Sequence, residues 1–281
     1  MKLGCSSWSF REPIQAGAMD LFAFIKQAHR LGFKAVELLH SHFRETSHAY
    51  LDDLTAVAQS EAMEISALSP SNDFAQVDST KRAGQVAIVR SWIQIASDMR
   101  VKNLRIFTGY DKEGVSYEEQ RRWVVECVKE CVPLARDLEV RLAVENHSSV
   151  MRTADELVAL MEEFNSPALR TNPDPTNFSE KIWTGLHPKQ PGDLSRKEIA
   201  EENELICESN RKILPYAVHA HLKVGFLSKA GKLARADYEG ILDTFTKANY
   251  DGVISLELVG PDVGDPSPVL AKCVTQLREM L

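Results

Sequence analysis

The sequence predicts a single-domain (β/α)8 barrel, the TIM barrel fold. Short β-like runs alternate with amphipathic helical runs along the whole chain. Eight β-then-α units favour parallel strands, because each helical crossover returns the chain to the same edge of the sheet. A length of 281 residues also fits one closed barrel, which typically holds about 250 residues around one core. We therefore predict one domain over residues 1–281.

The first half of the chain contains four of the predicted strands, at residues 2–7, 34–39, 64–68 and 103–108. Helices are predicted at residues 20–31, 80–99 and 116–137. In the first of them, apolar side chains recur at three- and four-residue spacing from Leu21 to Leu31, which makes one apolar face. Gly32 follows that helix, as glycine often does just past a helix end. Pro133 should kink the third helix or mark its last turn.

The second half contains the other four strands, predicted at residues 141–145, 168–174, 217–223 and 252–258. Helices are predicted at residues 153–164 and 196–214, and helical patterns follow the last two strands. Residues 179–195 are rich in Pro, Gly and Lys, which predicts a long rim loop over the barrel mouth. No GxGxxG or GxxxxGK[ST] motif follows any strand, so the nucleotide-binding fingerprints are absent.

Composition excludes several classes of protein. With 33 Lys and Arg against 40 Asp and Glu, the net charge of −7 argues against a nucleic-acid partner. The five cysteines form no CxxC pair, which is not typical of a disulfide framework or a structural zinc site. No run approaches the ~18 apolar residues of a membrane span, and the N-terminus shows no signal-peptide core. We expect a cytoplasmic protein without a membrane partner, and homo-oligomerisation stays open.

Ionisable residues end four successive strands. Side chains of a barrel strand alternate between the lumen and the surrounding helices. In the fifth strand, Leu142 and Val144 must face the helices, which leaves Glu145 inside. The same alternation gives one inward ionisable residue at the end of each strand from five to eight: Glu145, Asp174, His221 and Glu257. Barrel enzymes place their chemistry at these C-terminal strand ends.

Such a cluster predicts a metal site. Three neighbouring carboxylates repel one another, and some of them must take up protons unless a cation neutralises them. Three oxygen ligands and one imidazole suit Mn²⁺, Mg²⁺, Co²⁺, Zn²⁺ or Fe²⁺, and the ligand set does not choose among these ions. We therefore predict that Glu145, Asp174, His221 and Glu257 bind one divalent metal ion. His219, two residues before His221, is expected to be a hydrogen-bonded lumen residue instead.

Short motifs surround these four positions. They are Val-Glu-Asn-His at 144–147, Pro-Asp-Pro-Thr-Asn-Phe at 173–178, His-Ala-His-Leu-Lys at 219–223 and Ile-Ser-Leu-Glu-Leu at 254–258. Together with residues 31–38, which run from a helix end into a strand containing Glu37, they resemble the xylose-isomerase-like barrel superfamily of sugar and sugar-phosphate isomerases and epimerases. The resemblance covers the whole chain. It is specific for the superfamily and much less so for a substrate.

The resemblance implies the same four metal ligands. It also implies that Glu145 and Glu257 are catalytic, because two glutamates flank the substrate in the ketose 3-epimerases of this group and exchange a proton with the carbon between them. A metal ion at the ketone and adjacent hydroxyl oxygens would stabilise an enediolate, and proton transfer on two faces needs two bases. We expect a metal-dependent sugar or sugar-phosphate isomerase or epimerase.

Substrate-binding residues are less well defined. The candidates are Trp8, Glu37, Arg105, His147, Asn177 and Lys223. The motifs at 173–177 and 221–223 look most like the pentulose-phosphate epimerase branch, in which Lys223 would hold a phosphate or polarise a hydroxyl. Many relatives have His in place of Asn177. No arginine follows one turn beyond His221, although free-ketose epimerases use one there to bind substrate.

Three alternative functions stay open. A dehydratase of a keto-sugar or inosose would use the same metal ion and enolate but expel a hydroxyl group. A phosphodiesterase like the apurinic endonucleases needs further histidines after the second and third strands, whereas the third strand leads into Ser-Pro-Ser-Asn-Asp at 69–73. A non-catalytic sugar-binding barrel is the third alternative, against which the intact Glu145 and Glu257 argue.

Overall fold

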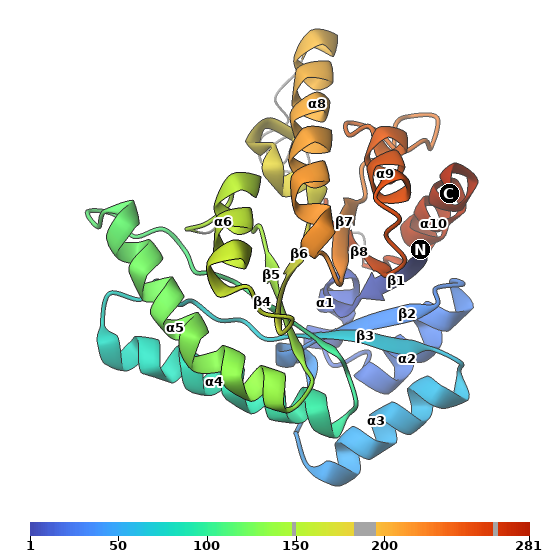
Figure 1. Cartoon of the computed structure of the whole chain (residues 1–281). Coiled ribbons are helices and arrows are strands. Elements are labelled where there is room, and N and C mark those ends of the chain that lie inside the picture. The colour runs from blue at the N-terminus through green and yellow to red at the C-terminus, as the bar shows by residue number, and fades with distance from the viewer. Residues whose placement is uncertain (148–149, 183–194, 261–263) are drawn as a thin grey trace.

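The computed structural model describes residues 1–147, 150–182, 195–260 and 264–281. Eight strands form one sheet in the order β6-β5-β4-β3-β2-β1-β8-β7, and the strand pairs are parallel. The strands are β1 (Lys2–Ser6), β2 (Ala35–Leu39), β3 (Glu64–Ser69), β4 (Asn103–Ile106), β5 (Arg141–Glu145), β6 (Leu169–Asn172), β7 (Ala220–Val224) and β8 (Val253–Leu258). Helices surround this sheet (Figure 1).

The described helices of five residues or more are α1 (Arg11–Gln15), α2 (Leu21–Arg30), α3 (His48–Ser60), α4 (Ser79–Asp98), α5 (Tyr117–Asp137), α6 (Ala154–Phe164), α8 (Arg196–Ile213), α9 (Tyr238–Lys247) and α10 (Ser267–Met280). The predicted helices are confirmed to within two residues at each end. Pro133 lies inside α5, which continues to Asp137. The α3 helix was not predicted, although Leu51, Leu54 and Ala58 give it a buried apolar face.

The two terminal strands of the sheet, β6 and β7, meet and close the barrel. Thr171 and Ala217 form an isolated parallel bridge. The backbone N–H of Val218 donates to Thr171 O at 3.1 Å, and that of His221 donates to Pro173 O at 2.8 Å. These contacts confirm the predicted (β/α)8 barrel, in which the C-terminal ends of all eight strands face the same end.

The strands alternate their side chains as predicted. Leu142, Leu222 and Leu256 are fully buried in the apolar core of strands and helices. Polar side chains fill the lumen, where His219 Nε2 lies 3.0 Å from Ser66 Oγ and its Nδ1 lies 2.9 Å from Asn172 Oδ1. Both ring nitrogens of His219 therefore have hydrogen-bond partners, as expected for a buried polar side chain.

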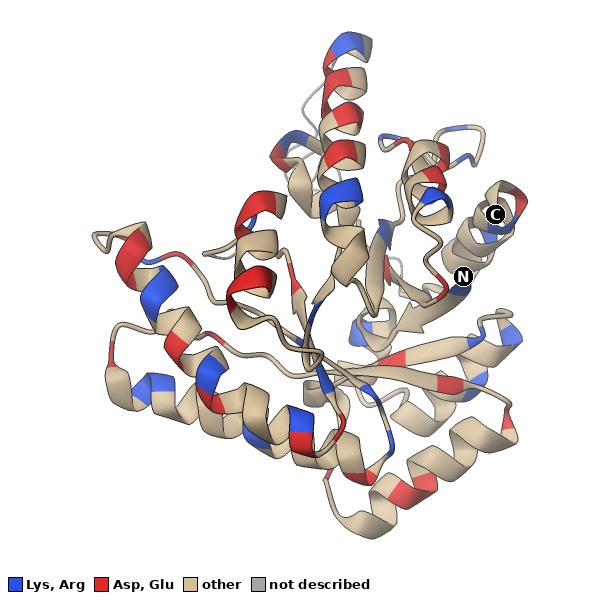
Figure 2. Ribbon diagram, viewed as in Figure 1, with Lys and Arg blue, Asp and Glu red and all other residues tan. Residues whose placement is uncertain are grey.

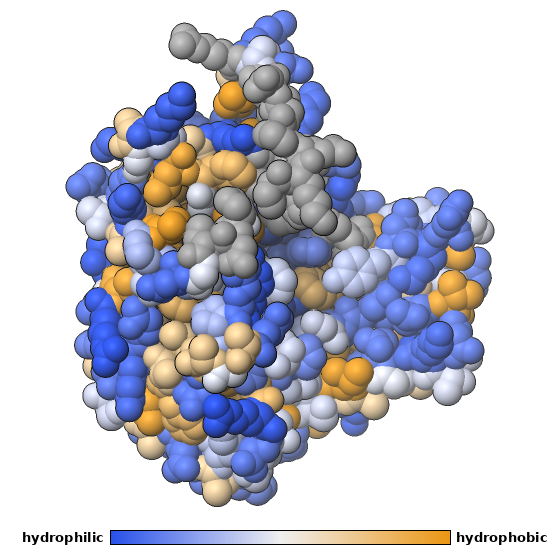
Figure 3. Space-filling view, turned by 180° about the vertical axis from the view of Figure 1, so that it is seen from behind, coloured by the Kyte–Doolittle hydropathy of each residue, from blue (hydrophilic) through white to orange (hydrophobic). Residues whose placement is uncertain are grey.

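The outer surface is mixed in charge and hydropathy. Acidic and basic residues are interspersed along α5, whereas α8 carries acidic residues between basic residues at its two ends (Figure 2). On the opposite face, hydrophilic residues cover much of the surface, and hydrophobic residues lie in separate groups among them (Figure 3). Within the described residues, no helix combines the length and the hydropathy of a membrane span. Most of the predicted rim loop at 179–195 lies outside the described residues, which end at 182 and resume at 195.

Gly225, directly after β7, provides a test of the packing at the barrel mouth. Its φ is +136°, and a Cβ there would lie 2.0 Å from Val259 O. Gly231 also has a positive φ, +73°, but a Cβ there meets nothing within 4 Å. We expect Gly225→Ala to lower the free energy of unfolding by about 3 kcal/mol, because backbone strain and a steric clash add.

Gly231→Ala introduces the backbone strain without the steric clash, and it should lower the free energy of unfolding by about 1 kcal/mol. Chemical denaturation of both variants measures the difference. Equal losses for the two alanines would show that the contact with Val259 does not constrain the mouth.

Candidate active site

The four ionisable residues predicted at the strand ends lie together. Glu145 ends β5, Asp174 follows β6, His221 lies in β7 and Glu257 in β8. One ligand atom from each lies within 4.8 Å of the others. His221 Nδ1 is 3.4 Å from Glu145 Oε1 and 3.6 Å from Glu257 Oε1. The strand register thus gathers a carboxylate–imidazole cluster at the C-terminal end of the barrel.

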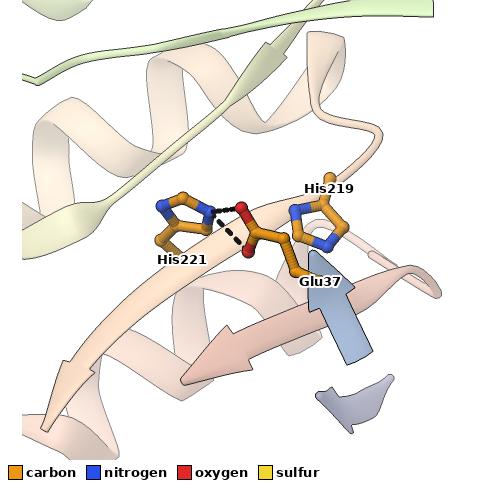
Figure 4. A group of neighbouring side chains, drawn as sticks. All are labelled: Glu37, His219 and His221. Atoms are coloured by element: carbon orange, nitrogen blue, oxygen red, sulfur yellow. Dashed lines mark hydrogen bonds and ion pairs between the residues drawn. The ribbon is translucent and has the colours of Figure 1, made fainter. Parts of the chain in front are cut away.

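Glu37 fixes the ring of His221 from the opposite side. Its two carboxylate oxygens lie 3.0 and 2.9 Å from His221 Nε2 (Figure 4). The hydroxyl of Ser69 donates to the same carboxylate. Histidines that bind metal ions commonly have such a carboxylate partner on the other ring nitrogen. The Glu37 contact therefore leaves His221 Nδ1 directed at Glu145 and Glu257.

A second cluster of side chains includes His219. Glu37, His219 and His221 also lie within reach of one another, and Figure 4 shows Glu37 between the two imidazole rings. Ser66 and Asn172 already occupy both nitrogens of His219. We therefore interpret this group as a hydrogen-bonded support for His221.

Asp174 is held by its neighbours in a set orientation. Asn146 Oδ1 accepts from the backbone N–H of Asp174 at 2.7 Å. Thr176 donates to Asp174 Oδ1 from its backbone at 3.1 Å and from its hydroxyl at 2.8 Å. The other oxygen, Oδ2, accepts from Lys223 Nζ. Lys223 also donates to Asn177 Oδ1 at 2.8 Å and lies 4.0 Å from Glu257 Oε2.

The two predicted catalytic glutamates have different electrostatic environments. Burial favours the neutral form of both. For Glu145, the positive charges of His221 and Arg105 outweigh burial and hold the pKa below its usual range. For Glu257, burial dominates and raises the pKa to about 7, with Glu145 and Glu37 adding to the increase. At neutral pH Glu145 is therefore ionised, while Glu257 is shared between its neutral and ionised forms.

The donor set suits a divalent cation. Burial opposes protonation of His221, but the carboxylates of Glu37, Glu257 and Glu145 outweigh it and raise the pKa of the imidazole. His221 Nδ1 is nevertheless buried without a hydrogen bond to any described residue. A ligand atom without a hydrogen bond, surrounded by carboxylate oxygens, fits an ion that binds oxygen and imidazole. Glu145, Asp174, His221 and Glu257 are the residues that would hold it.

A cavity of about 550 Å³ opens beside the cluster, a size typical of small-molecule sites. Six residues predicted from the sequence line it: Trp8, Arg105, Glu145, His147, Lys223 and Glu257. Glu37 and Asn177, also predicted to bind substrate, contact His221 and Lys223 respectively and do not line this cavity.

Other lining residues were not predicted. They include Arg11, Ser71, Phe107 and Tyr110. Each lies within a few residues of the end of β1, β3 or β4, and that position was the only sequence signal for them. Phe107, Tyr110 and His147 form an aromatic wall, in which the Phe107 and His147 ring centroids are 5.0 Å apart.

A family model described as a xylose isomerase-like TIM barrel matches residues 25–278. No curated protein matches the chain.

Several solved structures share the fold. D-psicose 3-epimerase from Clostridium cellulolyticum H10, solved with D-tagatose, superposes with a TM-score of 0.75 at 14% identity, covering 100% of this chain and 99% of that one. L-ribulose 3-epimerase gives 0.74 at 14% identity, with 100% and 94% covered. 3-keto-D-glucoside 4-epimerase from E. coli gives 0.73 at 12% identity, with 99% of each chain covered. At these identities the likeness establishes the fold.

Metal binding should stabilise the protein in a pH-dependent way. We expect Mn²⁺ at 100 times its Kd to raise the Tm of chelator-treated protein at pH 8 by about 5 °C. The shift should be smaller at pH 5.5, because ligands must lose their protons to bind a metal ion, and the pKa of Glu257 is raised to about 7. In metal-free protein the sign is opposite. The raised pKa of Glu257 makes its contribution to stability fall as the pH rises from about 4.5 to 7.

Glu257→Gln should reduce the Mn²⁺-dependent shift, whereas the exposed Glu130→Gln provides a matched control without effect. Differential scanning calorimetry at the two pH values measures all of these shifts. An equal shift in wild type and Glu257→Gln would remove Glu257 from the ligand set.

Proposed function

The chain belongs to the xylose isomerase-like TIM barrel family, and from this premise we propose that it is a divalent-metal-dependent sugar isomerase or epimerase. The observation that carries the proposal is the pair Glu145 and Glu257. Both line the cavity, and they come from β5 and β8, which are separated by two other strands around the barrel. A substrate in the cavity therefore meets a carboxyl group from two directions.

The two glutamates suit proton transfer at carbon. A bound divalent ion would polarise the carbonyl and hydroxyl oxygens of a sugar and so acidify the adjacent C–H bond. Ionised Glu145 accepts the proton from that carbon. Glu257, whose pKa is raised to about 7, donates a proton to the opposite face of the same carbon in epimerisation, or to the neighbouring carbon in isomerisation. Each proton taken is matched by one returned.

Lys223 supports the arrangement from inside the barrel. Its side chain is 2% exposed, and its ammonium donates to Asp174 and Asn177. Burial opposes its charge, but Asp174, Glu257 and Glu145 raise its pKa, so it stays protonated. These contacts favour a role in orienting Asp174 and Asn177 over the phosphate-binding role that the family resemblance suggests.

A dehydratase is the second candidate. It shares the proton removal by Glu145 but then loses a hydroxyl group from the neighbouring carbon. Glu257 favours it to some extent, because a carboxyl group that holds its proton near pH 7 can protonate a leaving hydroxyl group. The products separate the two reactions, since only the dehydratase releases water.

Deuterium exchange tests the proposal. We expect the Mn²⁺-loaded protein in D₂O to incorporate deuterium at the carbon next to a carbonyl in one of a panel of ketoses, ketose phosphates and inososes, as measured by NMR. Glu145→Gln and Glu257→Gln should each lower the rate of exchange at least 100-fold, because general acid–base catalysis contributes about that factor or more.

Glu130→Gln should exchange at the wild-type rate. Exchange with the sugar skeleton retained supports an isomerase or epimerase, and loss of water supports the dehydratase. The proposal fails if metal-loaded protein exchanges no member of the panel, or if Glu257→Gln exchanges as fast as wild type.

A further inference from the structure

Arg105 is a cation inside the barrel, and the described residues leave most of its hydrogen-bond donors unused. It projects from β4, is 4% exposed and lines the cavity. Its Nη1 donates to Pro70 O at 3.2 Å. Its Nε lies 3.5 Å from Glu145 Oε2 but forms no hydrogen bond with any described residue. Of the five N–H donors of a guanidinium, one is used by the described protein.

This arrangement is costly unless a ligand completes it. Burial removes hydration from the guanidinium, and the ion pair with Glu145 and the hydrogen bond to Pro70 O compensate only part of that loss. The face of the guanidinium lies against the Phe107 ring, with its carbon 3.9 Å from the ring centroid. Stacking fixes the plane of the guanidinium and leaves its edges for hydrogen bonds. Arginine in such a position is suited to planar, two-pronged recognition of carboxylate or phosphate oxygens.

The other cations of the cavity are already engaged. Arg11 donates to Trp8 O at 3.3 Å and to Leu258 O at 3.2 Å, lies 3.6 Å from a Glu12 oxygen, and covers the Trp8 ring. Lys223 donates to Asp174 and Asn177. Among the described residues that line the cavity, Arg105 is therefore the cation with the most hydrogen-bond donors left for a ligand.

The surroundings of Arg105 suit an anionic group. Ser71 and Tyr110, which both carry hydroxyl groups, line the same cavity and are exposed. The negative charge of Glu145 is shared with His221, 3.4 Å away, and with Asn177, which donates to it at 3.4 Å. Repulsion between Glu145 and a second anion beside Arg105 is reduced accordingly.

We propose that Arg105 binds an oxyanion of the substrate, so that the substrate is an acidic sugar, bearing a carboxylate or a phosphate, and not a neutral ketose. This inference rests on the proposed function for the identity of the reaction. The reacting carbon lies beside Glu145, and the oxyanion lies on the side of Glu145 that faces β4.

Matched substrates test this subsite. Each set contains a neutral ketose, its phosphate ester and the corresponding keto-sugar acid, and metal-dependent deuterium exchange is followed for each. The acidic members should exchange with a kcat/KM at least 100-fold above that of the neutral member. Comparing the rates for the phosphate ester and the keto-sugar acid identifies which oxyanion the site binds. Arg105→Met should raise KM for the preferred acid about 30-fold or more while changing kcat less, because charge-assisted hydrogen bonds are lost from binding.

Three controls separate recognition from structure. Arg105→Lys keeps the positive charge but lacks the two-pronged set of donors of the guanidinium. It should bind the preferred acid more tightly than Arg105→Met and less tightly than wild type. Arg11→Met removes the engaged arginine and should leave the preference for acids unchanged. The Mn²⁺-induced rise in Tm should persist in Arg105→Met, which would show an intact fold and ligand set.

A binding measurement keeps this test independent of turnover. Inorganic phosphate and acetate, titrated into metal-free wild-type protein by calorimetry, should show binding of at least one of them, and Arg105→Met should lose it. The inference is overturned if neither anion binds, or if Arg105→Met lowers exchange of neutral and acidic sugars equally, since Arg105 would then act only on Glu145. Absence of exchange with every substrate, with anion binding retained, would instead overturn the proposed reaction.

Discussion

The concentration of negative charge at one end of the barrel lumen is the constraint on which the rest of the site depends. Four carboxylates, of Glu37, Glu145, Asp174 and Glu257, lie within a few ångströms of His221 or Lys223. Burial raises the pKa of a carboxyl group. At Glu37 and Glu145 the positive charges of His221 and Arg105 outweigh burial and lower the pKa, whereas burial prevails at Glu257 and raises its pKa.

Positioning and chemistry are divided between two sets of residues. One set makes hydrogen bonds that orient the carboxylate–imidazole cluster and does not line the cavity among the described residues. It consists of Glu37, Asn146, Thr176 and Asn177. Glu145 and Glu257 face the cavity and can reach a substrate. A barrel provides this division readily, because its strands are rigid while the segments after them supply the cavity wall.

The alternation of side chains along each strand made the cluster predictable from the sequence. If the alternation were assigned one residue out of step, the aliphatic side chains of the strands would lie in the lumen. β5 was observed with the bounds predicted, at Arg141–Glu145. β6 ends before the predicted boundary since Pro173 has no N–H to continue it and Asp174 caps the next helical turn. The contact between Glu37 and His221 could not be predicted from the sequence, because 184 positions separate the two residues and only closure of the barrel brings them together. Arg11 and Tyr110 were missed for a related reason: they follow strands in segments whose course the periodicity does not determine.

The seam between β6 and β7 has a consequence for how the protein holds together. Few backbone hydrogen bonds join these strands, whereas side chains of the candidate site cross the seam, with Lys223 on one side and Asp174 and Asn177 on the other. Residues of the candidate site and the closure of the barrel therefore belong to one cooperative unit. Opening of this unit would expose the backbone amides of Val218 and His221 to hydrogen exchange together, so protection of these two amides is a local measure of whether the site is assembled. Substitutions at the seam therefore alter the stability of the barrel and the geometry of the candidate site together, whereas residues of the cavity wall can change without that cost.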